Sequence, residues 1–514
     1  MKKLKLVCVA IAMACAAPTF AGGLLTNTNQ NVAFNRMMSR EASIGIDGVY
    51  YNPAGVVFMS EGHHLSLNWQ LAYQTRNIEN GYALFTNNVN NPTTPRYIEG
   101  KAFAPVIPSL QYAYNKGKWS FQANFALTGG GGKCTFDNGL GSFEKIVAET
   151  ALGACQLAGI VDGVANQYGV PAVFSSDQRF GTEGKYSYES YMHGRQYYYG
   201  LSIGAAYTVS KNFSAFVGLR TVYASCNYYG YVENIKVGNM PLYQVLDPTK
   251  EDAANIELSC DQTGLGFTPI IGIDYKTGRW NFSAKYEFKT RMRLKNKSAN
   301  SESARNLEIL DRWADGESVP EDSPALLTLG ARWSVIPQLR LNAGWHHYFD
   351  KDAHQYNHHE KKLGGDTNEY LFGAEYDLSK VVEVSAGVQK TNYKMTGNYM
   401  EDVSFVVNSY SFGFGVGVHL NKKMTLNLAY FQTNYSDFST ESNNYNDLSN
   451  LTGKIVSGVA TALGQDEATA NAAASQVKNM LTTPVTEDGK SMLYGKNTFT
   501  RTNHVFGLGL NIEF

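Results

Sequence analysis

Apolar and polar side chains alternate along many short segments of this chain. Near its end every second position is apolar, namely Phe506, Leu508, Leu510, Ile512 and Phe514, and the positions between them are small or polar. A period of two residues predicts a β-strand with one apolar face. The same alternation recurs at residues 65–74, 280–289, 382–389 and 424–430.

The apolar faces of these predicted strands carry no charged residue. A Lys or Arg facing lipid at the middle of a bilayer costs roughly 2–4 kcal/mol, whereas a soluble sheet tolerates an occasional charge at its margin. The pattern therefore favours strands whose apolar side faces lipid.

The connections between the predicted strands alternate between short and long. Short polar turns occur at residues 115–118, 210–212, 276–278, 336–338, 378–380 and 421–423. Long excursions occupy residues 79–103, 129–186, 233–261, 297–322, 350–366, 394–402 and 438–497. Outer-membrane barrels have this asymmetry, with short turns at one end and long loops at the other. We therefore predict an all-β transmembrane barrel of about 14 antiparallel strands, closed by pairing of the last strand with the first.

Composition supports a barrel. Aromatic residues make up 13% of the 514 residues, charged residues only 17%, and there are 49 glycines. Mean hydropathy is −0.29, which fits strands whose apolar and polar sides average out, with aromatic girdles at the two interfaces. The formal net charge of −1 gives no reason to expect a nucleic-acid partner.

Three parts are expected along the chain. Residues 1–21 combine a basic start, a short apolar run and small residues at Thr19 and Ala21, which predicts a cleaved signal peptide. Residues 22–62 show no strand alternation and are expected to form a hatch, a plug inside the barrel. Residues 63–514 are expected to form the barrel and its extracellular loops. Small inward residues such as Gly204, Gly413 and Gly415 leave room for a plug.

Within the predicted hatch stands an Asn-Pro-Ala-Gly motif formed by Asn52, Pro53, Ala54 and Gly55. In this position, between a signal peptide and the first strand, the motif resembles that of the FadL family of bacterial outer-membrane transporters for long-chain fatty acids and other hydrophobic compounds. The long insertions at residues 129–186 and 438–497 show no residue-level match to the family, so the resemblance leaves the identity of the ligand open.

This resemblance implies a multi-pass barrel in the bacterial outer membrane, acting as a monomer without enzymatic activity or a cofactor. Hydrophobic molecules would be captured by the loops, bound in the lumen and released sideways into membrane lipid when the hatch shifts. The resemblance also implies that Asn52 contacts an inward kink of a nearby strand. The glycines that permit such a kink are Gly129, Gly130 and Gly131.

Other functions remain open at this stage. A general porin would need an open, charged lumen, and an adhesin would carry its function in the loops. An enzyme would need a nucleophile, and Ser202 in a Gly-x-Ser-x-Gly pattern is expected in mid-strand rather than on the sharp turn that this chemistry requires. Amphipathic helices are expected in the loops at residues 143–169 and 454–481.

A carboxylate ligand would favour a cation in the lumen. The inward cations considered are Arg220, Lys285, Arg332 and Arg340. The alternative use of these side chains is ion pairing with barrel carboxylates such as Glu287.

Cysteines and histidines supply two further candidates. The loop positions of the four later cysteines favour disulfides between Cys134 and Cys155 and between Cys226 and Cys260. His354 and His358 have the spacing of one helix face and are a possible zinc pair. Because the sequence shows no third ligand, a solvated loop without a metal is favoured there.

Overall fold

The computed structural model describes residues 26–514 except 168, 170, 172–178, 182, 306–307, 445–448, 450–452, 454–456, 458–465 and 492. The predicted signal peptide lies outside the described residues and stays a prediction.

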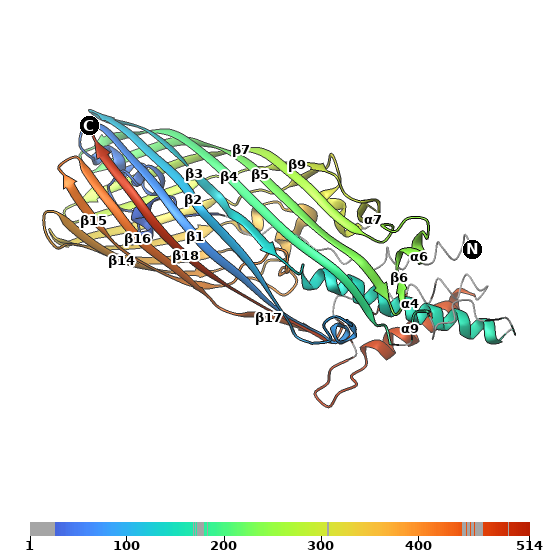
Figure 1. Ribbon diagram of the computed structural model, residues 1–514. Coiled ribbons are helices and arrows are strands. Elements are labelled where there is room, and N and C mark those ends of the chain that lie inside the picture. Colours follow the sequence, from blue (N-terminus) through green and yellow to red (C-terminus); the bar gives the residue numbers. More distant parts are fainter. Residues whose placement is uncertain are drawn as a thin grey trace.

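The described chain forms a closed barrel of fourteen long antiparallel strands (Figure 1). These are β1 (Gly62–Tyr82), β2 (Arg96–Lys116), β3 (Trp119–Phe136), β4 (Tyr186–Ser210), β5 (Phe213–Val237), β7 (Ile256–Thr277), β8 (Trp280–Glu287), β11 (Leu326–Ile336), β12 (Leu339–Tyr348), β13 (Asn368–Asp377), β14 (Val382–Asn392), β15 (Ser409–Asn421), β16 (Met424–Tyr435) and β18 (Gly495–Glu513). The last strand pairs with the first, with Leu510 opposite Leu67. The predicted fold class and strand number are confirmed.

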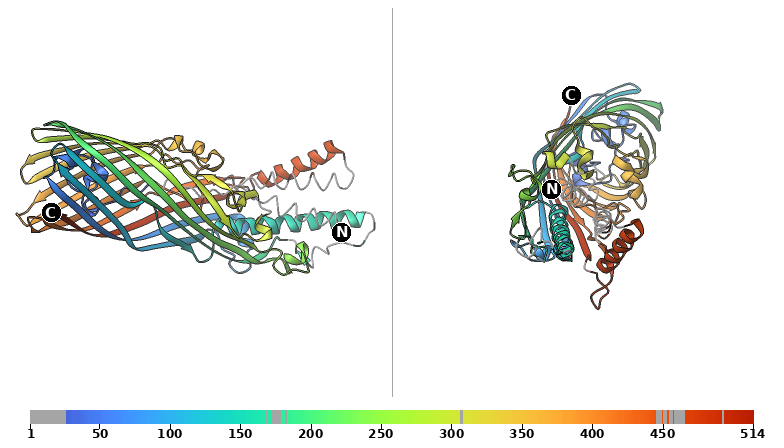
Figure 2. Two further views of the ribbon diagram at one scale, coloured as in Figure 1. Left: turned by 90° about the horizontal axis from the view of Figure 1, so that it is seen from above. Right: turned by 90° about the vertical axis from the view of Figure 1, so that its right-hand side faces the viewer.

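Short elements decorate the loop end. The short strands are β6 (Met240–Pro241), β9 (Arg293–Ser298), β10 (Ser318–Pro320) and β17 (Phe438–Ser442). Loop helices are η2 (Ala83–Asn87), α4 (Gly141–Gln167), α6 (Tyr243–Leu246), α7 (Glu302–Arg305), η3 (Glu308–Trp313), η4 (Asp350–Asp352), η5 (Tyr356–Lys362) and α9 (Glu467–Thr482). Helices α4 and α9 project beyond the barrel (Figure 2). No helix among the described residues is both long and apolar enough to cross a membrane.

The helix expected at residues 143–169 is confirmed as α4. Of the one expected at 454–481, α9 covers the second half. Most of the first half lies outside the described residues.

The outer face of the barrel carries an apolar band. Val217 and Leu219 of β5, Leu265 and Ile271 of β7 and Phe506 of β18 are all exposed. Further along β5 and β7 the outward positions turn polar, and Asn227 donates a hydrogen bond to Asp261 across the two strands over 2.8 Å. Along these two strands the apolar band therefore ends before this pair is reached, whereas the strands continue toward the loop end of the barrel.

The strands are longer than the sequence pattern predicted. Strands β4 and β5 each have 25 residues, whereas about 9–11 residues suffice to cross a bilayer. The ends of the excursions predicted at residues 129–186 and 233–261 are therefore strand rather than loop: β3 continues to Phe136, β5 continues to Val237, and β7 already begins at Ile256. The prediction was wrong there because polar outward residues beyond the lipid remove the alternation on which it depended.

Residues 26–61, here called the hatch, lie inside the barrel at the end that carries the short turns (Figure 1). They contain α2 (Val32–Arg36), α3 (Gly48–Tyr51) and η1 (Gly55–Phe58). Inward glycines of the wall give them room. A Cβ on Gly387 would stand 2.7 Å from the backbone nitrogen of Met38, and one on Gly413 would collide with the carbonyl oxygen of Asn35.

Candidate functional site

The first helix of the hatch is held by amides of the barrel wall. Asn31 caps α2 and donates through Nδ2 to Gln111 Oε1 over 2.8 Å. The backbone nitrogen of Val32 donates to Asn68 Oδ1 over 3.1 Å. These groups are buried, so losing one partner leaves the other unsatisfied at a cost of about 1–3 kcal/mol.

Buried ion pairs fix the next part of the hatch. Arg36 pairs with Glu383 of β14. Arg40 pairs with Asp47 of the hatch, at 2.7 Å, and with Glu375 of β13, at 2.5 Å. Charges taken out of water are tolerated only when paired in this way, so the hatch and the wall require each other.

A histidine of the wall also contacts the hatch. The ring of His346, on β12, lies between two carboxylates. Its Nε2 is 2.7 Å from Glu41 Oε1 of the hatch, and its Nδ1 is 2.7 Å from Glu369 Oε2 of β13. This contact joins the hatch to two neighbouring strands at once.

The Asn-Pro-Ala-Gly motif seats the far end of the hatch on β7. Asn52 Nδ2 donates to Asp274 Oδ2 over 2.6 Å, while Asn52 Oδ1 accepts from the Gly55 backbone nitrogen over 3.2 Å. The carbonyls of Pro53 and Ala54 accept hydrogen bonds from Gln122 and Ser214 of the wall. The expectation that Asn52 contacts a strand kink is therefore corrected, because its wall partner is an aspartate on an unbroken strand.

The glycine run on β3 does interrupt the ladder. The register with β4 shifts on both sides of Gly129–Gly130, and Gly130 has φ of 78°. The start of the hatch meets this place: Thr26 forms a bridge with Gly129, and Asn27 Nδ2 donates to the Gly130 carbonyl over 2.6 Å. Sequence reasoning missed Thr26 and Asn27. The only feature of the sequence that could have indicated them is the position of Asn27 ahead of the first helix of the hatch.

Beside this irregularity the ladder between β2 and β3 has a gap. The two strands pair up to Leu110 opposite Phe125 and again at Ala102 opposite Cys134. Among the described residues no ladder pairs join residues 103–109 to 126–133. The indole of Trp69 donates to the carbonyl of Pro105 over 2.9 Å. One backbone group left free by the gap is thereby satisfied.

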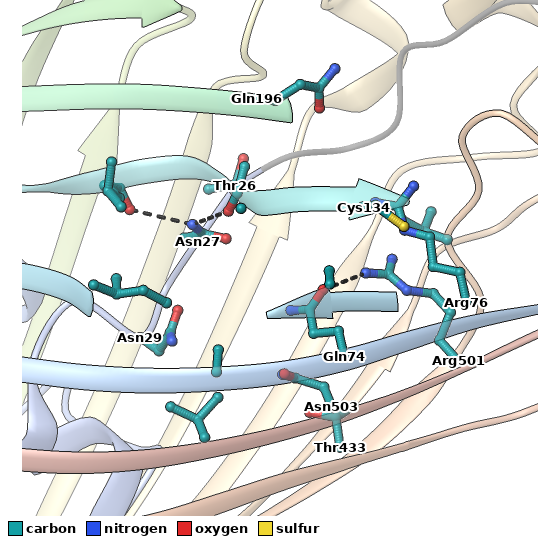
Figure 3. Close-up of a pocket in the computed structure, with 18 of the residues that line it drawn as sticks. Thr26, Asn27, Asn29, Gln74, Arg76, Cys134, Gln196, Thr433, Arg501 and Asn503 are labelled. Atoms are coloured by element: carbon teal, nitrogen blue, oxygen red, sulfur yellow. Dashed lines mark hydrogen bonds between the residues drawn. The ribbon is translucent and has the colours of Figure 1, made fainter. Parts of the chain in front are cut away.

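A cavity of about 210 Å³ lies above the hatch and reaches this gap (Figure 3). Its gap side is lined by Ile107, Pro108, Ala126, Leu127, Gly130 and Gly132. Its other walls mix apolar groups with polar ones, among them Phe136, Phe405, Tyr435, Gln74, Arg76 and Arg501. Such a cavity suits a mainly apolar molecule that carries a polar group at one end.

Two arginines stand together in this cavity. Arg76 of β1 and Arg501 of β18 are directly opposite each other in the register, and Figure 3 shows them side by side near Cys134. No carboxylate of the described residues forms an ion pair with either one. Among the described residues, Arg501 makes long hydrogen bonds of 3.3 Å to the Phe405 carbonyl and 3.4 Å to Gln74 Oε1, and its buried Nε has no partner. Its guanidinium group also lies 5.2 Å from the centroid of the Tyr435 ring.

Opposed like charges destabilise a sheet, so an anion bound between the two guanidinium groups would stabilise this pair. Sequence reasoning missed both residues. The sequence did contain a signal for Arg501. It lies two and four positions before Asn503 and Val505, and therefore on the same strand face as these inward residues.

The four lumen cations singled out from the sequence do not lie free. Arg220 and Lys285 both pair with Glu287, at 2.6 and 2.7 Å. Arg332 pairs with Glu375, and Arg340 pairs with Asp377, Glu375 and Glu383. Of the two uses considered from the sequence, the structure shows ion pairing for all four cations, with Glu287 as a partner of two of them. Ser202 lies in mid-strand on β4 and accepts a hydrogen bond from Arg220 over 3.1 Å.

Neither of the two expected disulfides is present in the structure, where Cys134, Cys155, Cys226 and Cys260 are free and buried. Cys134 packs in the apolar cluster of the lumen, whereas Cys155 of α4 packs in a separate cluster in the loops. Cys226 and Cys260 lie on neighbouring strands, but Cys226 is opposite Gln262 and Cys260 is opposite Tyr228. The prediction failed because Cys134 and Cys155 lie on different elements, β3 and α4, and because the register of β5 and β7 does not set Cys226 opposite Cys260.

Comparison with known proteins places the fold. No family model matches the chain, and no curated protein matches it in sequence. A solved structure of a FadL homologue from Pseudomonas aeruginosa is similar with a TM-score of 0.60 and 13% identity, covering 96% of this chain and 100% of that chain. The toluene transporters TodX of Pseudomonas putida and TbuX of Ralstonia pickettii give TM-scores of 0.51 and 0.50, at 14% and 13% identity. They cover 96% of this chain and 100% and 99% of their own. The expected resemblance is therefore confirmed at the level of the fold.

Proposed function

We propose that this chain, which has the fold of the FadL-type channels, lies as a monomer in a bacterial outer membrane and admits hydrophobic molecules that carry one negative charge. Long-chain fatty acids are the expected class. The exposed apolar band on the outer face supports the location, because such a surface is stable only against lipid or another apolar partner.

The observation that carries the substrate class is the pair Arg76 and Arg501. Two guanidinium groups that face one cavity and form no ion pair with a carboxylate of the described residues favour an anionic headgroup. Glu369, which also lines the cavity, pairs with His346 instead. A neutral hydrocarbon would leave both charges uncompensated, which argues against toluene as the preferred ligand here.

The rest of the cavity accounts for the apolar part of the ligand. Each methylene group removed from water contributes about 0.8 kcal/mol, so a chain of some sixteen carbons is driven strongly toward apolar walls. Phe136, Phe405 and Phe431 supply such walls in this cavity.

A path out of the cavity is offered by the gap between β2 and β3. The gap is bordered inside by Ile107 and Leu127 of the cavity and outside by the exposed side chains of Phe103 and Val106. A ligand leaving here moves from one apolar surface to another and enters lipid sideways. Movement of the hatch at Asn27, which bonds Gly130 at the edge of the gap, would control this step.

Binding of radiolabelled oleate to the purified chain in detergent tests the proposal. The double variant Arg76→Gln, Arg501→Gln should bind oleate at least tenfold to hundredfold more weakly, because the loss of even one charge-assisted hydrogen bond costs about 1.5–3 kcal/mol. Its binding of toluene should change little. Lys211→Gln, an exposed turn cation at the opposite end of the barrel, is the matched control.

Cells give the second readout. Uptake of labelled oleate should fall in cells that produce the double variant and remain normal in cells that produce the control. Equal oleate binding and uptake by the variant and the wild-type chain would refute the assigned substrate class.

A further inference from the structure

The loop between β12 and β13 brings three potential metal ligands together. His354 follows η4, and His358 and Glu360 lie within η5. Their ligand atoms all lie within 4.8 Å of one another. The sequence offered the two histidines without a third ligand, and the structure supplies it as Glu360.

The distances fit a tetrahedral ion. The Nδ1 atoms of His354 and His358 are 3.6 and 3.1 Å from the same oxygen, Oε1 of Glu360. With Zn–N and Zn–O bonds of about 2.0–2.1 Å, neighbouring ligand atoms of a tetrahedral zinc ion stand roughly 3.3 Å apart. An ion can therefore be placed among the three atoms with small side-chain movements.

Glu360 is oriented for this role. The residue is 1% exposed, and its second oxygen, Oε2, accepts a hydrogen bond from the backbone nitrogen of Gln355 over 3.0 Å. That bond leaves Oε1 directed at the two imidazoles. A hydrogen bond of this kind, from a neighbouring group to the ligand residue, holds a metal ligand in one orientation and is usual around bound metals.

The backbone at the site is held in an uncommon conformation. Asn357 and His358 have φ of 50° and 56°, in the left-handed region that costs a non-glycine residue about 1–3 kcal/mol. The expected helix face is therefore absent, and this turn brings His358 beside His354 instead. Their ring centroids are 5.9 Å apart.

The two histidine side chains are 58% and 62% exposed, so an ion reaches them from solvent and keeps an open position for water. A pocket beside His354 is also lined by Lys289, Arg291, Arg293 and Asp322. Lys289 lies 3.6 Å from Asp322, whose Oδ2 accepts a hydrogen bond from the His354 backbone nitrogen over 3.4 Å. Two imidazoles and one carboxylate suit zinc, copper or nickel, whereas magnesium and calcium prefer oxygen alone.

We propose that His354, His358 and Glu360 form a binding site for a divalent transition-metal ion, with Zn²⁺ as the ion to test. Binding would fix the left-handed turn. It would also stiffen a loop that is already tied to the segment after β14, where Gln355 Nε2 donates to the Tyr399 hydroxyl over 3.2 Å. This site is independent of the proposed transport function.

The test uses the full chain in detergent, without a polyhistidine tag and stripped of metal by a chelator. Co²⁺ is added as a spectroscopic substitute, and Zn²⁺ is then titrated against it. We expect one Co²⁺ per chain with the strong visible absorption of tetrahedral coordination, and its displacement by Zn²⁺. The double variant His354→Ala, His358→Ala and the single variant Glu360→Gln should each weaken binding about tenfold or more.

The control is His193→Ala, a partly buried histidine on β4 at the same end of the barrel. It should bind Co²⁺ as the wild-type chain does. Heat-dependent electrophoretic mobility establishes that each variant still forms the barrel. Absence of tetrahedral absorption in the wild-type chain, or equal binding by the control and the triad variants, would overturn the proposal.

Discussion

Asn52 of the hatch and Asp274 of β7 are joined by a hydrogen bond of 2.6 Å between Asn52 Nδ2 and Asp274 Oδ2. The same aspartate oxygen also accepts from Asn281 Nδ2 over 2.8 Å, and Asn281 Nδ2 in turn donates to the Ala42 carbonyl. One buried carboxylate of the wall therefore organises two places on the hatch.

Asn52→Ala should loosen the hatch without opening the barrel. The variant leaves Asp274 with one hydrogen bond fewer, at a cost of about 1–3 kcal/mol. Hydrogen exchange of residues 43–58 should become faster, while exchange in the β7–β8 ladder stays slow. Asn90→Ala in an exposed loop is the control. Unchanged exchange of the hatch in Asn52→Ala would show that this bond does not hold it.

Gly387→Ala should displace the first part of the hatch, because the added methyl group would meet the Met38 backbone nitrogen at 2.7 Å. Backbone yields less readily than a side chain, and overpacking of this kind costs about 1–3 kcal/mol. Protease cleavage within residues 26–45 should increase in the folded barrel. Gly159→Ala on α4, where an added Cβ meets nothing within 4 Å, should leave the cleavage pattern unchanged. Equal resistance of both variants would contradict the close packing.

The loop between β12 and β13 should lose stability as pH rises. Burial raises the pKa of Asp350 from its ordinary value of 3.8 to about 7, against the lowering effect of hydrogen bonds from Thr367, whose backbone nitrogen lies 2.8 Å away. The folded loop therefore binds the proton more tightly than the unfolded one. Its stability from this group is complete below about pH 4 and is lost as pH rises through about 7.

Hydrogen exchange of residues 349–367 between about pH 4 and pH 8, corrected for the intrinsic rate, measures this loss. Burial also lowers the pKa of His359 in this loop to about 4, which gives the opposite trend in both chains. Asp350→Asn keeps an acceptor for the Thr367 nitrogen and removes only the Asp350 titration, so the protection of the wild-type loop relative to this variant should fall as pH rises. Asp352→Asn, an exposed residue of the same turn, should behave as the wild-type chain does. A constant ratio of protection between the wild-type chain and Asp350→Asn would disprove the assignment to Asp350.

Titration of thiols in the denatured, unreduced chain should detect all four cysteines of the described residues, since none is in a disulfide. The protein should be prepared from an oxidising compartment, where a disulfide would have formed if geometry allowed it. Two missing thiols would restore one of the pairings expected from the sequence.

The barrel could be predicted because its wall repeats one physical rule. Outward residues such as Leu508 and Phe506 must be apolar because they face lipid, whereas inward residues such as Gly507 need not be. Apolar positions therefore recur with a period of two along each strand. The rule stops at the edge of the lipid. Beyond it, the outward positions of Asn227 and Asp261 are free to be polar, so the sequence showed loops where the structure has strands.

The site was harder to predict because it depends on strand register. The pattern showed that Arg220 and Lys285 point inward, but only the pairing of strands places Glu287 beside both. The same register brings Arg76 opposite Arg501 and leaves that pair without a carboxylate. The sequence thus shows which face of a strand a residue occupies. It does not show that Arg76 lies opposite Arg501, 425 positions away.

The prolines of β2 give the gap in the wall a further property. An unpaired backbone N–H in hydrocarbon costs several kcal/mol, yet Pro105 and Pro108, both within the stretch of β2 that does not pair with β3, have no N–H to leave without a partner. The two prolines also leave this edge of β2 with fewer backbone donors, so a strand from a second copy of the chain pairs with it less readily. An opening built in this way can persist in lipid without inviting aggregation.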